Sequence, residues 1–328
     1  MTPAKKFTRL DGLEAVPAHL RGAVVAIGNF DGCHRGHQAV FAEALRLARA
    51  RGVPALVLTF EPHPRDVFAP KPFLYRLSGP DAKAELVAAL GFDGLVILKF
   101  DRELAGVAPD RFIADTLVDA LAVSGAVVGA DFHFGKARAG TPAYLAEAGS
   151  AKGFSVTVLP MLVEGDDHVS STRIRAALEA GDVETANRLL GYHHFFSGVV
   201  VPGDRRGREL GYPTANIAMP ATTGLFQGVY AVKLRVGGEV FGGVAAYGKP
   251  MFDDAPPPFE TFIFDFDRDI YGETVTVALL NFLRPSVKFE GLAALIAQMD
   301  RDAEAARITI ARAAPLSELD AALGFVVG

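Results

Sequence analysis

The hydrophobic pattern of this chain changes after Gly191, and the two patterns require different folds. Before Gly191, short apolar runs alternate with longer stretches of helical periodicity, and glycines separate them. Strands that alternate with helices predict βαβ crossovers and a parallel sheet covered on both faces. The expected strands are Val24–Ile27, Val53–Phe60, Gly94–Leu98 and Ala126–Val128, and the expected helices are His37–Arg51, Asp81–Leu90, Pro109–Leu121, Arg173–Glu179 and Val183–Leu190.

After Gly191, apolar runs rich in β-branched and aromatic residues follow one another, separated by Gly, Pro and Asp. One separator, Gly237-Gly238, is a hairpin signal. Only the stretch from Leu292 to about Ile310 is clearly helical. This pattern predicts a small β-barrel followed by a C-terminal helix, with the domain boundary at residues 186–192. The expected strands are Phe196–Val201, Gly228–Val236, Glu239–Ala245, Glu260–Phe266 and Thr274–Leu280.

Length and composition narrow the class of protein further. The 328 residues predict about two domains at roughly 150 residues each. The 33 Lys and Arg stand against 38 Asp and Glu, giving a formal net charge of −5, so no basic excess points to nucleic acid. Cys33 is the single cysteine, which excludes an intramolecular disulfide and a Cys-rich zinc site and fits a reducing compartment. With no secretory signal and no apolar run of about 18 residues, we expect a cytoplasmic protein without a membrane span.

A glycine-rich segment follows the first expected strand and opens the first expected helix: Gly28-Asn29-Phe30-Asp31-Gly32-Cys33-His34-Arg35-Gly36-His37. Glycines let a ligand approach the backbone, and N–H groups at a helix start attract anions. The carboxyl end of a parallel strand is also where open α/β sheets bind ligands. The segment therefore favours a phosphate site with His34 and His37 as donors. Two alternatives stay open: a plain turn with solvated histidines, and a zinc site completed by Asp131 and His133.

A second candidate segment, Ser170-Ser171-Thr172-Arg173-Ile174-Arg175, lies at the start of an expected helix. Ser and Thr are ordinary helix N-caps, so this segment alone indicates a cap with solvated arginines. Together with the first segment, its hydroxyls, its N–H groups and an Arg can form the second half of a triphosphate site.

In the second half, the densest polar segment runs from Gly203 to Asn216, and its three arginines among three glycines can wrap phosphates. Thr214 and Asn216 lie two apart, so on a strand both side chains face the same side and can share one cation. A surface hairpin with a solvated basic tip explains this segment equally well. Glu260 begins another expected strand, where an exposed edge-strand carboxylate is the ordinary interpretation.

Four motifs make the first half resemble the bacterial FAD synthetase module, a nucleotidyltransferase with a His-x-Gly-His signature. In chain order they span about residues 24–180. The resemblance implies adenylyl transfer, in which the phosphate of FMN attacks the α-phosphorus of ATP and pyrophosphate leaves. The motifs are the segment Gly28–His37, Thr59-Phe60-Glu61-Pro62-His63-Pro64, Val128-Gly129-Ala130-Asp131-Phe132-His133-Phe134-Gly135 and the segment Ser170–Arg175.

Carried onto matching positions, the resemblance implies a role for each polar residue of these motifs. His34 and His37 stabilise charge on the ATP phosphates, and catalysis is by positioning and electrostatics. Glu61 and Asp131 lie near the metal or the flavin, and Cys33 has no catalytic role. The β/γ end of ATP is held by Ser171, Thr172 and Arg175, and the other ATP-binding positions are Gly28, Asn29, Phe30, Asp31 and Gly36.

The second half resembles riboflavin kinase over about residues 195–310, and that family folds as a six-stranded β-barrel. The resemblance implies that Thr214 and Asn216 bind Mg²⁺-ATP and that Glu260 accepts the proton of the riboflavin 5′-hydroxyl. It also implies that Arg284 lies near the flavin or the metal. The motifs are Gly211-Tyr212-Pro213-Thr214-Ala215-Asn216, Gly228-Val229-Tyr230-Ala231-Val232, Glu260, Asp269-Ile270-Tyr271-Gly272 and Phe282-Leu283-Arg284, and the phosphate-binding positions are Gly203, Arg208 and Gly211.

This half departs from the family pattern at two places. Gly248-Lys249-Pro250-Met251 stands where the family commonly has Gly-x-Arg-Pro-Thr, and Arg284-Pro285-Ser286 lacks the family's acid. Neither place includes the three residues with implied roles at ATP and at the hydroxyl proton. We therefore expect activity to survive and flavin affinity to be affected.

We expect an α/β protein with a Rossmann-like nucleotidyltransferase domain and parallel sheet over residues 1–187, and a six-stranded β-barrel riboflavin kinase domain with a terminal helix over residues 188–328. The expected function is the conversion of riboflavin to FMN and of FMN to FAD. The ligands are riboflavin, FMN, FAD, ATP, ADP and pyrophosphate, with Mg²⁺ as cofactor; we expect no nucleic acid, no membrane and at most a weak homo-oligomer. Two alternatives are a flavin-binding regulatory protein without kinase turnover and a monofunctional adenylyltransferase with an unrelated barrel.

Overall fold

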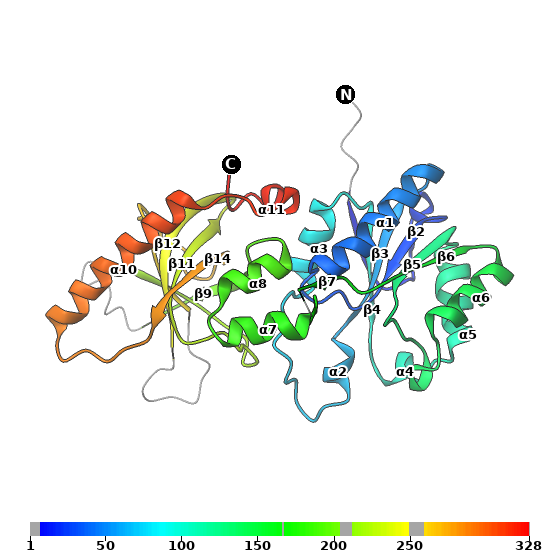
Figure 1. Ribbon diagram of the computed structural model, residues 1–328, viewed down its shortest axis with the longest axis horizontal. Coiled ribbons are helices and arrows are strands. Elements are labelled where there is room, and N and C mark those ends of the chain that lie inside the picture. Colours follow the sequence, from blue (N-terminus) through cyan, green and yellow to red (C-terminus); the bar gives the residue numbers. More distant parts are fainter. Residues whose placement is uncertain (1–6, 166, 204–211, 249–258, 328) are drawn as a thin grey trace. The chain divides into compact units, whose positions relative to one another are not determined.

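The computed structural model describes residues 7–165, 167–203, 212–248 and 259–327 (Figure 1). The chain forms two compact units. The N-terminal unit comprises Met1–Leu74 and Gly79–Ser170, and the C-terminal unit comprises Tyr75–Ser78 and Ser171–Gly328. The expected boundary between residues 187 and 188 falls inside helix α8 (Val183–Leu190). Helices α7 (Ser171–Glu179) and α8 therefore group with the C-terminal unit by compactness.

The N-terminal unit contains a six-stranded sheet in the order β1-β4-β3-β2-β5-β6, with all neighbouring strands parallel. The parallel sheet predicted from the sequence is confirmed, and it gains β1 and β6 at its edges. Both additional strands are partly exposed along their length, so they lack the continuous apolar run of a central strand. The strands are β1 (Thr8–Asp11), β2 (Val24–Ile27), β3 (Ala55–Glu61), β4 (Gly94–Lys99), β5 (Gly125–Gly129) and β6 (Ser155–Leu159).

Helices flank this sheet (Figure 1). Helix α1 (Arg35–Arg51) packs on β2, β3 and β5, while α3 (Pro80–Ala89) packs on β4. One buried cluster of the sheet includes Ile27, Leu58 and Val128 together with helical residues of the segment 112–121. The remaining short elements are η1 (Ala18–Leu20), α2 (Pro64–Val67), α4 (Arg102–Ala105), α5 (Pro109–Arg111), η3 (Lys136–Arg138), α6 (Pro142–Lys152) and the hairpin β7 (Val163–Glu164) and β8 (Asp167–His168).

The segment 109–121, expected to be an α-helix, is mostly a π-helix in the structure. A single α-helical turn, α5, leads into the π-helix η2 (Phe112–Ala120). Phe112, Ile113 and Leu117 all join the buried cluster. Hydrophobic periodicity identifies such a segment as helical but does not distinguish i→i+4 from i→i+5 hydrogen bonding.

The strand order reverses direction at β2. From β2 the chain moves to β3 and β4 on one side, and later to β5 and β6 on the other. In open α/β sheets, ligands bind outside the carboxyl ends of strands at such a switch point. The segments that follow β2 and β5, residues 28–34 and 130–135, therefore flank the expected ligand position.

The C-terminal unit contains a closed six-stranded barrel in the order β10-β13-β12-β11-β14-β9, antiparallel throughout. Ile217, Val232, Leu234, Phe259 and Leu279 are among its fully buried residues. The predicted barrel is confirmed. Its strands are β9 (Phe195–Val201), β10 (Thr214–Ile217), β11 (Gly228–Val236), β12 (Glu239–Tyr247), β13 (Phe259–Ile263) and β14 (Thr274–Pro285).

The predicted terminal helix α10 (Leu292–Arg312) packs on β11, β12 and β14, and a further helix, α11 (Glu318–Leu323), follows it. The six-residue α11 was not expected, and Asp320 anchors it. Asp320 Oδ2 lies 2.7 Å from His193 Nδ1, and Asp320 Oδ1 accepts from the His193 backbone N–H at 3.0 Å. Among the residues that the structure describes, no helix is both long enough and apolar enough to cross a membrane.

Candidate active sites

The turn between β2 and α1 has an unusual backbone. Phe30, Gly32 and Cys33 all have positive φ angles, at 49°, 79° and 38°. Two of the three are not glycines, and residues held in this sparsely populated region concentrate at functional sites. A Cβ on Gly28 would lie 2.9 Å from the Phe30 ring, so only glycine fits there. The turn 28–34 therefore holds a specified, strained shape that a plain connection does not need.

The two histidines of this segment form one stacked pair. Their ring centroids lie 3.6 Å apart with an interplanar angle of 19°. His34 is buried and caps α1, because its Nδ1 accepts from the His37 backbone N–H at 3.4 Å. The edge of Phe30 packs against His37, with ring centroids 5.2 Å apart. The alternative of two solvated histidines is therefore wrong.

His37 is neutral at physiological pH in this environment. Burial, followed by the nearby charges of His34 and Lys83, holds the pKa of His37 well below 6.5. Its Nδ1 atom is inaccessible to solvent and has no hydrogen-bond partner among the described residues. A neutral imidazole carries one N–H donor, so His37 can donate to an anion that enters the site.

Sequence reasoning missed Lys83 of α3, the most buried charged group beside this turn. Its side chain is 0% exposed. The Nζ atom donates to Asn29 O at 2.8 Å, Thr59 Oγ1 at 3.0 Å and Glu61 Oε1 at 2.9 Å. Lys83 is the single lysine of α3, which also carries Asp81 and Glu85, and on sequence alone it is read as a solvated side chain.

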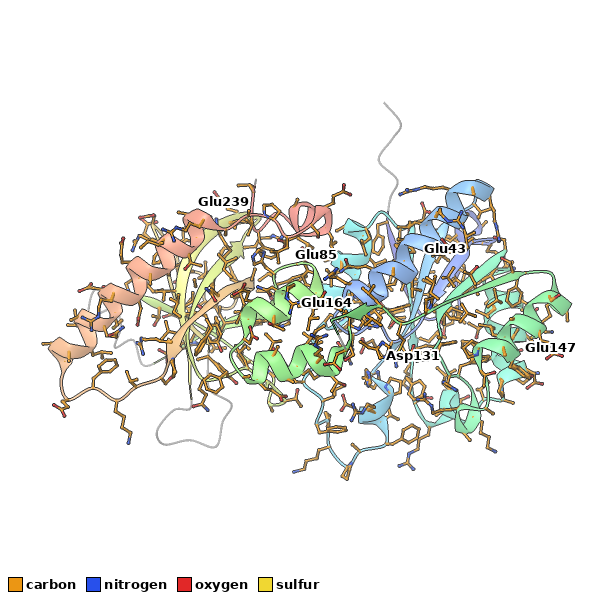
Figure 2. All side chains as sticks on the ribbon, in the orientation of Figure 1. Glu43, Glu85, Asp131, Glu147, Glu164 and Glu239 are labelled. Carbon is orange, nitrogen blue, oxygen red and sulfur yellow. The ribbon has the colours of Figure 1, made fainter. Side chains whose placement is uncertain are left out.

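Glu61 and Asp131 lie at the carboxyl ends of β3 and β5, on either side of the turn that follows β2. Glu61 is bound to Lys83, whereas the side chain of Asp131, labelled in Figure 2, is exposed. The Nδ1 atom of His133 lies 3.0 Å from the backbone oxygen of Asp131. Among the described residues no cluster of three His, Cys, Asp or Glu side chains that could hold a metal ion is found, and this includes the alternative zinc set.

Of the second predicted phosphate segment, Ser170 ends the N-terminal unit and Ser171–Arg175 belong to the C-terminal unit. Ser171 begins α7, and Thr172 is exposed at its first turn. Arg175 is buried, with its Nε donating to Tyr75 O at 2.6 Å. Arg175 is therefore not the solvated side chain of an ordinary capped helix. Its role at ATP stays a prediction, as do those of Ser171 and Thr172.

In the barrel, strand register brings two predicted residues together. Asn216 of β10 pairs directly with Glu260 of β13. Directly opposed residues point to the same face of a sheet, and Thr214, two residues before Asn216, shares that face. Strand β13 pairs with β10 on one side and with β12 on the other, so Glu260 does not lie on an edge strand. Its side chain is nevertheless exposed, as the ordinary interpretation expected.

Gly203 lies against this same face. An added Cβ at Gly203 would overlap the side-chain amide of Asn216, so the backbone of residue 203 touches that amide directly. Arg208 and Gly211 lie outside the described residues. The segment resumes at Tyr212, whose hydroxyl donates to Asp300 of α10 and whose ring packs on Phe262 at 4.9 Å.

Arg284, at the end of β14, is held by α10. Its Nε and Nη2 donate to the two oxygens of Asp302 at 2.8 and 2.6 Å. This bidentate pair fixes the guanidinium on the barrel wall. The two departures from the family pattern are neighbours in the structure. The Oγ atom of Ser286 lies 3.3 Å from the position that a Cβ on Gly248 would take. Lys249, Pro250 and Met251 lie outside the described residues.

Comparison with known proteins assigns a family to each half. Residues 16–173 match the model of the FAD synthetase family, and residues 190–310 match that of the riboflavin kinase family. A bifunctional riboflavin kinase/FMN adenylyltransferase of Listeria monocytogenes is 40% identical over 88% of this chain and 93% of its own. The proteins of the same name from Bacillus subtilis and Escherichia coli are each 38% identical over 87% of this chain, and over 91% and 92% of theirs.

One solved structure matches nearly the whole chain. It is described as a macrolide-efflux protein from Streptococcus pneumoniae, with 32% identity and a TM-score of 0.80, and the match covers 92% of this chain and 98% of that one. The same two-domain fold therefore exists in a solved structure. Since the curated relatives and both family models agree in kind and in order, the chain belongs to the family of bifunctional riboflavin kinase/FMN adenylyltransferases, with the FAD synthetase part first and the riboflavin kinase part second.

Proposed function

We propose that adenylyl transfer to FMN takes place at the turn 28–34 and the start of α1. The observation that carries this assignment is the strained turn with its stacked histidines, of which His34 is buried, at the switch point of the parallel sheet. The N-terminus of α1, a helix of 17 residues, adds N–H groups and a positive dipole end for phosphate oxygens. Gly28, Asn29, Phe30, Asp31 and Gly36 shape this cradle.

In the proposed reaction, an FMN phosphate oxygen attacks the α-phosphorus of ATP, the bond to the β-phosphate oxygen breaks, and pyrophosphate leaves. His34 and His37 donate to the phosphate oxygens on which negative charge increases. Such donors act by stabilising the transition state more than the bound substrate. Ser171, Thr172 and Arg175 hold the β- and γ-phosphates, and Glu61 and Asp131 flank the flavin or the metal. Because these three α7 residues take part, we propose residues 1–187 as the domain that carries out FAD synthesis.

We propose that riboflavin phosphorylation takes place on the face of β10 and β13, within residues 188–328. The pairing of Asn216 with Glu260 supports this assignment. Glu260 takes the proton of the riboflavin 5′-hydroxyl as that oxygen attacks the γ-phosphorus of ATP, and ADP leaves. Gly203, Arg208 and Gly211 hold the ATP phosphates, and Arg284 borders the flavin.

The donor set on this face suits Mg²⁺. Thr214 and Asn216 supply a hydroxyl and an amide oxygen, the hard ligands that Mg²⁺ takes alongside substrate phosphates and water. When bound there with ATP, Mg²⁺ would neutralise phosphate charge. Thr214 and Asn216 would hold it, and Gly203 keeps the Asn216 amide in place because no side chain separates the two.

We further propose that the protein works in the cytoplasm. Its proposed ligands are ATP, ADP, pyrophosphate, riboflavin, FMN and FAD. The single cysteine, Cys33, supports a reducing compartment, and burial raises its pKa to about 12, so its thiol is unreactive. The net charge of −5 supports the absence of a nucleic-acid partner. We propose at most a weak homo-oligomer and no membrane association.

Incubation of the full chain with riboflavin, ATP and Mg²⁺, followed by chromatography, tests both assignments. FMN and then FAD are expected, and omission of Mg²⁺ should stop both. FAD from FMN without FMN from riboflavin would support a monofunctional adenylyltransferase. Flavin binding without any product would support a regulatory protein.

A further inference from the structure

The side chain of Lys83 is enclosed within the N-terminal unit, yet it bears a charge. Its Nζ has three acceptors at 2.8 to 3.0 Å, which matches the three N–H donors of an ammonium group. Glu61 supplies the opposite charge and is itself only 14% exposed. The amine is therefore fully hydrogen-bonded, and removing it would take one donor away from each of the three acceptors.

A buried ion pair is a poor way to gain stability. Desolvation of both charges offsets most of their attraction, and apolar residues of similar volume often stabilise a fold as well or better. What such a pair does supply is a fixed geometry for the groups that it joins. The groups that Lys83 holds in place are therefore its three acceptors, Asn29 O, Thr59 Oγ1 and Glu61 Oε1.

Each acceptor borders the proposed adenylyl-transfer site. Asn29 O belongs to the strained turn after β2, and Glu61 is the last residue of the neighbouring strand β3. Thr59 joins the two, since its Oγ1 also donates to Asn29 O at 3.0 Å. Lys83 thus links α3, the end of β3 and the turn 28–34 in one network.

We propose that Lys83 is a positioning residue for FAD synthesis, which fixes the turn 28–34 and the Glu61 carboxylate in the geometry that receives ATP and FMN. This inference rests on the proposed location of adenylyl transfer. Lys83 touches no substrate; it acts through Asn29 O and Glu61. Loss of the network lets the turn relax toward ordinary backbone angles, and small misplacements of this kind are costly in catalysis.

Lys83→Met in the full chain tests the proposal, with Leu86→Ala as the matched control. Leu86 lies on the same helix, is 0% exposed and has no polar group that could reach the turn. At a temperature where both variants are folded by circular dichroism, kcat for FAD formation should fall about 10²-fold in Lys83→Met. In Leu86→Ala it should stay near the wild-type value. FMN formation by the same molecules should be unchanged in both.

Hydrogen exchange supplies a readout that a purely stabilising role would not move. Backbone amides of residues 28–36 should exchange faster in Lys83→Met and not in Leu86→Ala. A folded Lys83→Met protein with the FAD kcat of Leu86→Ala, or with unchanged exchange in this segment, would overturn the proposal.

Thr59→Val decides the matter if Lys83→Met does not fold. Valine keeps the shape of threonine and removes the hydroxyl, which donates to Asn29 O and accepts from Lys83 Nζ. With these two hydrogen bonds lost, kcat for FAD should fall about 10-fold or more. An unchanged kcat would overturn the inference. His37→Ala tests the location of adenylyl transfer independently of Lys83. Full FAD synthesis in His37→Ala would reject the proposed location. Loss of FAD synthesis in His37→Ala, with full activity in Thr59→Val, would reject only the role of Lys83.

Discussion

The two halves of this protein build their sites from different parts of a β-sheet. In the N-terminal unit the candidate residues follow the strands, in the turn after β2 and beyond β3 and β5. In the barrel of the C-terminal unit, two candidate residues lie within the strands, where Asn216 and Glu260 face each other across β10 and β13. An open parallel sheet collects its loops at one edge, whereas a closed antiparallel barrel has no free edge.

This difference has a consequence for how each site is held. A site on a turn needs support from outside the strands, and the N-terminal unit provides it with positive φ angles, stacked rings and the buried Lys83. A site on a strand face inherits its geometry from the ladder of backbone hydrogen bonds. The barrel site should therefore depend on side-chain chemistry, and the turn site on the network beneath it.

The largest expected effect is that of Glu260→Gln, which keeps the shape of the side chain and removes its basicity. If Glu260 takes the hydroxyl proton, kcat for FMN formation should fall by about 10²–10⁴-fold, the usual contribution of a positioned base. FAD formation from added FMN should be unaffected. Initial rates with saturating riboflavin measure both.

Glu239→Gln is the control for this prediction. Glu239 lies on β12 of the same barrel and pairs with Arg268 at 2.8 Å on the surface (Figure 2). FMN formation should be normal in Glu239→Gln. A similar small change in both variants would remove Glu260 from the mechanism.

His37→Ala is the corresponding test of the other half. FAD formation should fall by about 10²-fold or more, because loss of one preorganised donor costs about 3–4 kcal/mol of transition-state stabilisation. FMN formation should be intact, and the exposed His19 supplies the control variant His19→Ala. Equal loss of both activities in His37→Ala would contradict two separate sites.

Gly203→Ala sharpens the comparison on the barrel side with a smaller effect. A methyl group here overlaps the Asn216 amide, so the KM for ATP in FMN formation should rise about tenfold, as for one lost charge-assisted contact. Gly291→Ala is the matched control, because nothing lies within 4 Å of its added Cβ. Equal KM values for the two variants would show that Asn216 is not part of the ATP site.

The smallest expected effect is a difference in acid stability. The folded pKa of His37 lies below 6.5, so the unfolded chain binds the extra proton and the N-terminal unit loses stability as pH falls below about 6.5, by at most about 1.4 kcal/mol per pH unit. In the C-terminal unit, burial acts to raise the pKa of Asp320. Hydrogen bonds and the charge of His193 outweigh burial, so the pKa of Asp320 is lowered. The stability that Asp320 contributes is complete above pH 3.8 and is lost only as pH falls further.

Residual activity after a brief heat challenge compares the two units, because FMN formation requires only the C-terminal unit, whereas FAD formation also requires the N-terminal unit. Between pH 7 and pH 5, the surviving FAD activity of the wild type should fall more than its FMN activity. His37→Ala should remove part of the pH dependence of N-terminal unfolding, followed by circular dichroism. The same pH dependence in wild type and His37→Ala would contradict the burial of a neutral histidine.

Local patterns were enough to predict most of the fold. Periodicity and glycines identify the central strands, and the barrel follows from short apolar runs between turn residues. The edge strands β1 and β6 were missed because they are partly exposed, and α11 because its six residues are held by a contact between Asp320 and His193, far apart in the sequence. Interactions of this kind leave no periodic trace in a sequence.

The same limit applies to the sites. Motifs with glycine and histidine identify the turn 28–37, but Lys83 reaches it from another helix and has no motif of its own. The register that sets Asn216 against Glu260 is also a property of the closed barrel and not of either segment. Residue types could be predicted, while the partners that orient them could not.

A mixing experiment tests the central claim, that the two activities occupy independent sites, most directly. Glu260→Gln alone should make almost no FMN from riboflavin, and His37→Ala alone should stop at FMN. An equimolar mixture of the two variants should convert riboflavin to FAD, because FMN released by one protein is adenylylated by the other. Accumulation of FMN without FAD in the mixture, with both proteins folded, would contradict the account.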